Sequence, residues 1–303
     1  MNNVFCTVVS RLRAYQAIAL FLSLREVCPQ TIIYALCVDD SVGALLERLA
    51  LPNVRLLGIE ELREPAVSRL RQSRTLAEYC WTLKPVMIEA AFQAAQAERV
   101  TYLDSDLFFW NDPLPLFARQ AEEDVLLSKG DISVSSLAPW LVDYLQGLMG
   151  NYNSGLISFR NTSAGLACLR WWKDSCLRAC FHHPQEGDFG DQTYLNEMPQ
   201  RFSGVADIAT PGVNLGHWNY AGHRYSFFDG KLYVDNSKLI CYHFSGFRIL
   251  PGGVILQIHE RERTDLPFFY PIYSGILREV MALAERILPG FDGYADEEDL
   301  ETL

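Results

Sequence analysis

The sequence predicts an α/β fold with a Rossmann-like central sheet, mixed but mostly parallel, that is flanked by helices. Short apolar strand patterns alternate with amphipathic helix patterns through the first half of the chain. The 303 residues are 49% hydrophobic, which is enough for one continuous core. Because each pair of parallel neighbours requires a crossover connection, this alternation favours a parallel sheet covered on both faces.

The chain opens with a strand, a helix and a second strand that ends at Asp39-Asp40. In this half we expect strands at residues 4–9, 31–38 and 54–58, and helices at 15–27, 42–49 and 83–97. In the last of these helices Pro85 falls in the predicted first turn, where its missing N–H removes no hydrogen bond.

Val100-Thr-Tyr-Leu-Asp104 is β-branched and aromatic, as expected of a central strand, and ligand sites of open α/β sheets lie at such strand ends. Beyond it the patterns predict a turn at 112–115, strands at 125–128 and 155–159, helices at 140–149, 164–180 and 273–287, a loop-rich segment at 188–219, and a hairpin of 232–236 with 238–243. The absence of a repeat or a linker pattern predicts one domain, residues 1–260, with a C-terminal helical appendage, residues 261–303, that ends in an acidic tail.

The net charge of −11 argues against a nucleic-acid groove as the main working surface. A metal or a few basic residues would have to meet an anionic ligand locally. The eight cysteines show no CxxC spacing, which favours free thiols in a reducing cytosol. Neither a secretory signal nor an apolar run of about twenty residues is found, so we expect a cytoplasmic protein without a membrane-spanning helix.

Asp104 and Asp106 follow the predicted central strand and place two carboxylates near each other. A hard divalent cation takes oxygen ligands of this kind, and such a cation stabilises the negative charge of a departing diphosphate. A lone Asp-x-Asp is more often a solvated turn, so the interpretation depends on what lies around it.

Five segments between residues 100 and 246 resemble GT-A glycosyltransferases, in particular glycosyltransferase family 8 and related bacterial sugar transferases. They are Val100-Thr-Tyr-Leu-Asp-Ser-Asp106, Asn151-Tyr-Asn-Ser-Gly155, Gly190-Asp-Gln192, Val213-Asn-Leu-Gly-His-Trp-Asn219 and Tyr242-His-Phe-Ser-Gly246. Their order along the chain is that of the family. The resemblance implies the GT-A, or nucleotide-diphospho-sugar transferase, fold.

The resemblance also implies a site. Asp104, Asp106 and His243 would hold Mn²⁺ or Mg²⁺, and Asp191 with Gln192 would be catalytic. The donor would be bound by Lys84, Ser105, Asn153, Gly155 and Arg248, and its nucleoside by Thr7 and Asp39. The family usually has a phosphate-binding lysine where this chain has Ile249, and Arg248 would substitute for it.

Simpler interpretations stand beside these roles. A single histidine after a strand is often only a structural residue, an aspartate after glycine often caps a helix, and Lys84 could be a surface lysine at a helix start. At that start a positive charge would be unfavourable against the helix dipole, which favours an anionic partner.

The function implied is metal-dependent transfer of a hexose from a nucleotide-diphosphate sugar, with UDP favoured, to a hydroxyl of a glycan or a lipid-linked acceptor. Retention is favoured and inversion stays open. Polysaccharide or lipopolysaccharide assembly and peripheral association with the inner face of a membrane are compatible with it, and nucleic acid is not an expected partner. The alternatives are a non-catalytic GT-A domain, a phosphohydrolase of the haloacid type, and a zinc site at His182-His183, of which the last two are weakly supported.

Overall fold

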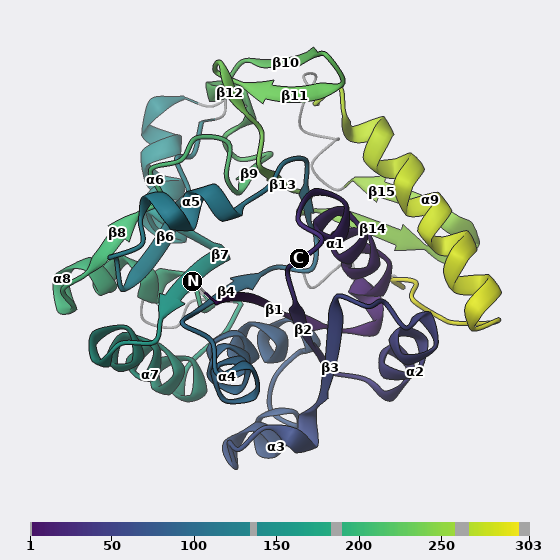
Figure 1. Cartoon of the computed structure of the whole chain (residues 1–303), viewed down its shortest axis with the longest axis horizontal. Coiled ribbons are helices and arrows are strands. Elements are labelled where there is room, and N and C mark those ends of the chain that lie inside the picture. Colours follow the sequence, from purple (N-terminus) through teal and green to yellow (C-terminus); the bar gives the residue numbers. More distant parts are fainter. Residues whose placement is uncertain (1, 134–137, 183–189, 258–266, 297–303) are drawn as a thin grey trace.

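A seven-stranded sheet forms the centre of the protein in the computed structural model, which describes residues 2–133, 138–182, 190–257 and 267–296 (Figure 1). The strand order is β3-β2-β1-β4-β7-β6-β8. The strands are β1 (Asn3–Val9), β2 (Ile33–Cys37), β3 (Val54–Gly58), β4 (Arg99–Leu103), β6 (Val125–Lys129), β7 (Tyr152–Arg160) and β8 (Val205–Asp207). Only β7 runs antiparallel to its neighbours, β4 and β6. The predicted mixed, mostly parallel sheet is confirmed.

The alternating side chains of β1 face two separate halves of the core, as the period of two in a strand requires. Phe5 and Val9 pack in a cluster with α1 (Ala14–Val27), α2 (Asp40–Leu49) and α9 (Tyr270–Ile287). Val4, Cys6 and Val8 pack in the other cluster with α4 (Leu76–Ala95) and α7 (Ser163–Arg178). Figure 1 shows α4 and α7 together at the bottom of the view and α9 along its right edge. Both faces of the sheet are therefore covered.

The helix predicted at residues 83–97 is longer than expected, and the position assigned to Pro85 was wrong. The α4 helix begins at Leu76 because Thr75 and Glu78 form a capping box, in which each side chain accepts a hydrogen bond from the other residue's backbone N–H. Pro85 lies in the interior of the helix and costs one backbone hydrogen bond there. Lys84 is consequently in the middle of α4, away from the unfavourable end of the helix dipole.

A small second sheet, not predicted, joins the carboxyl end of β4 to the C-terminal third of the chain. In it β13 (Cys241–His243) pairs antiparallel with β5 (Leu107–Phe109) and parallel with β9 (Leu215–Gly216). The predicted hairpin is only partly correct. Its first strand, β11 (Lys231–Val234), pairs with β12 (Ser237–Lys238) and with β10 (Tyr225–Phe228), whereas the chain then leaves to form β13.

The remaining elements are short or peripheral. They are α3 (Ala66–Leu70), α5 (Leu114–Arg119), α6 (Pro139–Met149), α8 (Met198–Arg201), the strand pair β14 (Phe247–Leu250) and β15 (Val254–Gln257), and 3-10 helices at Arg11–Arg13, Ile59–Glu61, Thr193–Glu197, Tyr220–Gly222 and Pro251–Gly253.

The described part of the C-terminal segment packs on the main body. Tyr273, Leu277 and Val280 of α9 are buried in the same cluster as α1. A boundary at residue 260 stays a prediction, since residues 258–266 lie outside the described residues, as do the acidic tail beyond residue 296 and the second residue of His182-His183.

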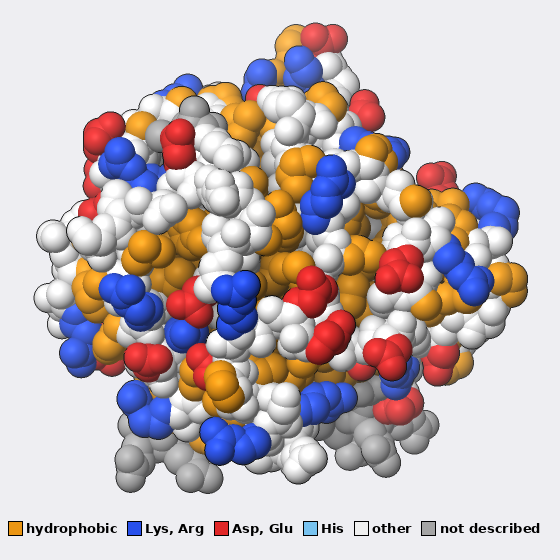
Figure 2. Space-filling view, turned by 60° about the horizontal axis from the view of Figure 1, so that its bottom comes forward, with side chains coloured by type: hydrophobic (Ala, Val, Ile, Leu, Met, Phe, Trp, Pro, Cys, Tyr) orange, Lys and Arg blue, Asp and Glu red, His pale blue; other side chains and the backbone are white. Residues whose placement is uncertain are grey.

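All eight cysteines are free thiols, as predicted. On the face shown in Figure 2, side chains of Lys and Arg are interspersed with those of Asp and Glu. Among the described residues, no helix is both long and apolar enough to cross a bilayer.

Candidate active site

The turn that carries the two aspartates is fixed by backbone hydrogen bonds to two other strands. The N–H of Asp104 donates to the carbonyl of Gly155 in β7 at 2.7 Å, and the carbonyl of Asp106 accepts from the N–H of Phe244, after β13, at 2.9 Å. Ser105, which is 7% exposed, lies between the two aspartates. The carboxylates thus sit where the central strand ends, held from both sides.

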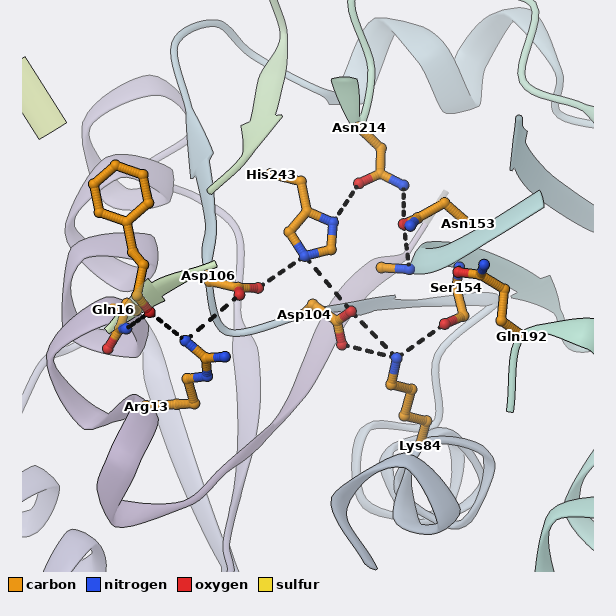
Figure 3. A network of polar contacts seen from close by, with 12 residues as sticks. Arg13, Gln16, Lys84, Asp104, Asp106, Asn153, Ser154, Gln192, Asn214 and His243 are labelled. Carbon is orange, nitrogen blue, oxygen red and sulfur yellow. Dashed lines mark hydrogen bonds and ion pairs between the residues drawn. The ribbon is translucent and has the colours of Figure 1, made fainter. Parts of the chain in front are cut away.

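His243 joins the two aspartates at this turn in a group of three side chains that could hold a metal ion (Figure 3). Its Nε2 lies 2.9 Å from Oδ1 of Asp106 and 3.8 Å from Oδ2 of Asp104. One ligand atom from each residue lies within 4.8 Å of the others. Burial would raise the pKa of Asp106, but His243 holds that pKa below its ordinary value, with smaller contributions from Arg13 and Arg248. Two carboxylates and an imidazole fit a divalent cation.

Lys84 joins the carboxylate of Asp104 to a third acidic residue, Asp191. Its Nζ lies 3.0 Å from Asp104, 3.2 Å from Asp191 and 3.0 Å from Oγ of Ser154. Burial would lower the pKa of Lys84, but the two carboxylates raise it above its ordinary value. The sequence predicted an anionic partner for Lys84 because the lysine was expected at a helix start. That position was wrong, since Lys84 lies in the middle of α4. Its anionic partners are carboxylates of the site itself, Asp104 and Asp191.

Asp191, which Lys84 contacts at 3.2 Å, is followed by Gln192 in the same part of the site. Burial raises the pKa of Asp191, and the nearby Asp104 raises it further, against the opposing effect of Lys84. Gln192 is held at both ends of its amide: Oε1 accepts from the N–H of Ser154 at 3.2 Å, and Nε2 donates to the carbonyl of Met149 at 2.8 Å. The 3-10 helix that follows has no side-chain cap, so capping does not account for these residues.

Gly155 lies against His243 and is hydrogen-bonded to Asn153, and both residues were predicted to bind the donor. The N–H of Gly155 donates to Oδ1 of Asn153 at 2.9 Å. A Cβ atom at position 155 would lie 2.5 Å from Cε1 of His243 and 2.8 Å from Oδ1 of Asn153. Glycine is therefore required for the imidazole to reach its place. Gly155 was predicted from the sequence as a site residue, but only the structure shows its contact with His243.

Two arginines act on Asp106: Arg13 contacts its carboxylate, and the charge of Arg248 also lowers its pKa. Arg248 is 8% exposed. Nη1 of Arg13 lies 3.9 Å from Oδ2 of Asp106 and donates to the carbonyl of Phe247 at 2.8 Å. Arg13 was not predicted from the sequence, although its place just after the first strand, at the carboxyl end of a parallel sheet, could have indicated it.

Of the two residues predicted at the nucleoside, only Asp39 lies at this edge of the sheet. Oδ2 of Asp39 accepts from the N–H of Arg11 at 2.8 Å, which ties the ends of β1 and β2 together. Thr7 is completely buried within β1. The structure therefore brings Asp39 to this edge but places Thr7 inside the sheet.

Comparison with known proteins decides the family. The signature described as nucleotide-diphospho-sugar transferase matches residues 71–215, which include both aspartates of the turn and Gln192. YfnF of Bacillus subtilis (strain 168) is 45% identical over 301 residues, 99% of each chain, and YfnD of the same strain is 30% identical over 295 residues, 96% of this chain and 93% of YfnD. The chain belongs to the nucleotide-diphospho-sugar transferase family.

A solved member of this fold agrees with the assignment. The galactosyltransferase LgtC, crystallised with donor and acceptor sugar analogs, superposes with a TM-score of 0.54 at 16% identity, covering 100% of both chains. The fold is thus GT-A, as expected, and by family the protein is a glycosyltransferase. YfnF and YfnD are described as uncharacterized, so they add no substrate.

Proposed function

We propose that this glycosyltransferase moves a hexose from a nucleotide-diphosphate sugar to a hydroxyl of a glycan or lipid-linked acceptor, with a divalent cation held by Asp104, Asp106 and His243. The observation that carries the proposal is the meeting of these three side chains, from positions far apart in the sequence, at the carboxyl end of β4. When bound, the cation supplies positive charge to the diphosphate leaving group. The imidazole favours Mn²⁺ over Mg²⁺.

The residues around the cluster divide into a diphosphate side and a sugar side. Arg13, which contacts Asp106, and Arg248, whose charge also acts on that carboxylate, would bind phosphate oxygens, which a guanidinium can grip with two hydrogen bonds. Together they offer the positive charge that the family's lysine would provide at Ile249. We assign the nucleoside to the edge near Asp39, with UDP as the favoured donor.

On the sugar side, Lys84 holds Asp104 and Asp191 in fixed positions, so that Asp191 can bind a donor hydroxyl. Gln192 is the next residue, and its amide is anchored at both ends by backbone hydrogen bonds; we assign it to the reacting sugar carbon. An LgtC structure with a TM-score of 0.51 is described as an active-site mutant in which glutamine is replaced by glutamate, which supports a glutamine role in this fold. We favour retention of configuration at the sugar, with inversion as the alternative.

The proposal is tested by measuring nucleotide release from a panel of sugar nucleotides with Mn²⁺ and with EDTA, followed by NMR of the anomeric product. Metal-dependent release that falls by two or more orders of magnitude in Asp106→Asn is expected. Nucleotide binding without turnover for any common donor would instead support a non-catalytic GT-A domain.

Sedimentation with vesicles tests the further proposal that the protein associates peripherally with a membrane during polysaccharide or lipopolysaccharide assembly.

A further inference from the structure

We infer that Asn214 fixes His243 in the ring tautomer that can bind a metal, and that the backbone of Gly155 imposes this through Asn153. The inference rests on the proposed metal site and concerns how the protein prepares it. Asn214 is a positioning residue, because it contacts the imidazole and not the metal position itself. Figure 3 shows the chain of contacts from Asn153 through Asn214 to His243.

The direction of these hydrogen bonds follows from one group that cannot be reversed. The backbone N–H of Gly155 can only donate, so the group facing it at 2.9 Å is the amide oxygen of Asn153. Nδ2 of Asn214 donates to that same oxygen at 2.9 Å. The amide of Asn214 is therefore oriented with its nitrogen toward Asn153.

The opposite end of that amide then faces the histidine. Oδ1 of Asn214 lies 3.2 Å from Nδ1 of His243, and an amide oxygen can only accept. Nδ1 must carry the hydrogen, which leaves Nε2 as the nitrogen available to a metal. Nε2 is the atom that faces Asp106 and Asp104. A metal-binding histidine commonly donates its other N–H to an oxygen, which fixes the tautomer and the orientation of the ring.

The backbone conformation at Asn214 indicates that the protein needs the asparagine side chain at this position for its contacts. Its φ is +53°, a left-handed conformation that glycine adopts at lower cost, yet the residue is an asparagine that is 1% exposed. Trp218 packs its ring against that of His243 with centroids 5.3 Å apart, and on another side the imidazole lies so close to the Gly155 backbone that a Cβ there would be 2.6 Å from Nδ1. With the ring confined in this way, the hydrogen bond to Asn214 decides which nitrogen is the ligand.

Metal binding without nucleotide tests the inference independently of activity. Asn214→Ala removes the acceptor and should weaken Mn²⁺ binding by about 10–100-fold, measured by EPR of free Mn²⁺. Asn214→Asp retains an acceptor for Nδ1–H and should bind Mn²⁺ much more tightly than the alanine variant. The matched control is Asn219→Ala, because Asn219 is equally buried in the same loop, 1% exposed, and bonds Gly216 and Gly130 but not the histidine.

A second measurement does not depend on the folding of any variant. In ¹⁵N-labelled wild-type protein with diamagnetic Mg²⁺, the imidazole resonances of His243 should show hydrogen on Nδ1 and none on Nε2. Hydrogen on Nε2 alone, unchanged Mn²⁺ affinity in Asn214→Ala, or an equal loss of affinity in Asn219→Ala would each overturn the inference. Wild-type protein that binds neither Mn²⁺ nor Mg²⁺ would overturn the proposed metal site as well, so the two failures are distinguishable.

Discussion

Replacing Lys84 by methionine should destabilise the protein more than any surface charge change, because two buried carboxylates lose their shared cation. The lysine side chain is 4% exposed, and Nζ lies 3.0 Å from Asp104 and 3.2 Å from Asp191. Removing one partner from a buried ion pair costs about 3–5 kcal/mol, because the charge left behind stays buried. That is a large part of the roughly 5–15 kcal/mol by which domains are stable.

The free energy of unfolding lost in Lys84→Met should depend on pH, and the structure gives the direction. The pKa of Asp191 is already raised in the folded protein and should rise further without Lys84. A carboxyl group whose pKa is higher in the folded than in the unfolded state destabilises the fold when ionised, so its cost is largest at high pH and fades as pH falls through the folded-state pKa. The difference in unfolding free energy between wild type and Lys84→Met should therefore be smaller at pH 5 than at pH 8.

Urea unfolding followed by circular dichroism at these two pH values measures the effect. Lys173→Met is the matched control, since that lysine also contacts two carboxylates, Glu64 at 3.3 Å and Glu89 at 2.8 Å, but Glu89 is 31% exposed and can recover hydration. We expect the control to cost about 1 kcal/mol or less. A Lys84→Met variant that loses no more free energy of unfolding than the control, or whose loss grows as pH falls, would contradict the role of Lys84 as the shared cation of two buried carboxylates.

Three further changes test other parts of the structure. Arg13→Gln should weaken nucleoside-diphosphate binding by about 10–100-fold in titration calorimetry, which is the value of one charge-assisted hydrogen bond. The control variant Arg55→Gln, at an exposed arginine, should bind as tightly as wild type. Equal affinities for the two variants would remove Arg13 from the phosphate site. Gly155→Ala should abolish detectable Mn²⁺ binding and lower the free energy of unfolding by about 1–3 kcal/mol. Gly147→Ala, with open space around it, should not destabilise the protein. A Gly155→Ala protein that binds Mn²⁺ normally would contradict the close contact between Gly155 and His243. Thr75→Ala should lower the free energy of unfolding by about 1 kcal/mol, and no change would mean that the capping box does not define the start of the helix.

The central sheet could be predicted from sequence because its strands are marked by local patterns. Residues 4–9 and 100–104 are apolar, β-branched and bounded by polar turns, and both are strands in the structure. The start of α4 was predicted seven residues late, because Pro85 was taken as a first-turn residue and the Thr75-x-x-Glu78 pattern upstream was overlooked.

The site residues could be listed from motifs, but their mutual contacts could not. The pairing of β13 with β5, which brings His243 to Asp106, involves two strands of three residues each, too short to leave a periodic pattern. Arg13 contacts Asp106 across 93 positions (106 − 13) and Asn214 contacts His243 across 29 positions, and no hydrophobic pattern marks either contact. Long-range partners of this kind depend on topology, which hydrophobic patterns do not encode.

The pairing of β13 with β5 also sets when the metal cluster can exist during synthesis. Asp106 leaves the ribosome 137 residues before His243 (243 − 106), which at about 5–20 residues per second is roughly 7–27 s. Throughout that interval the nascent chain carries two neighbouring carboxylates that lack their imidazole partner. The newly made enzyme should therefore acquire its metal only near the end of translation, and a ribosome stalled before codon 243 should display a chain that folds much of its sheet yet binds Mn²⁺ weakly.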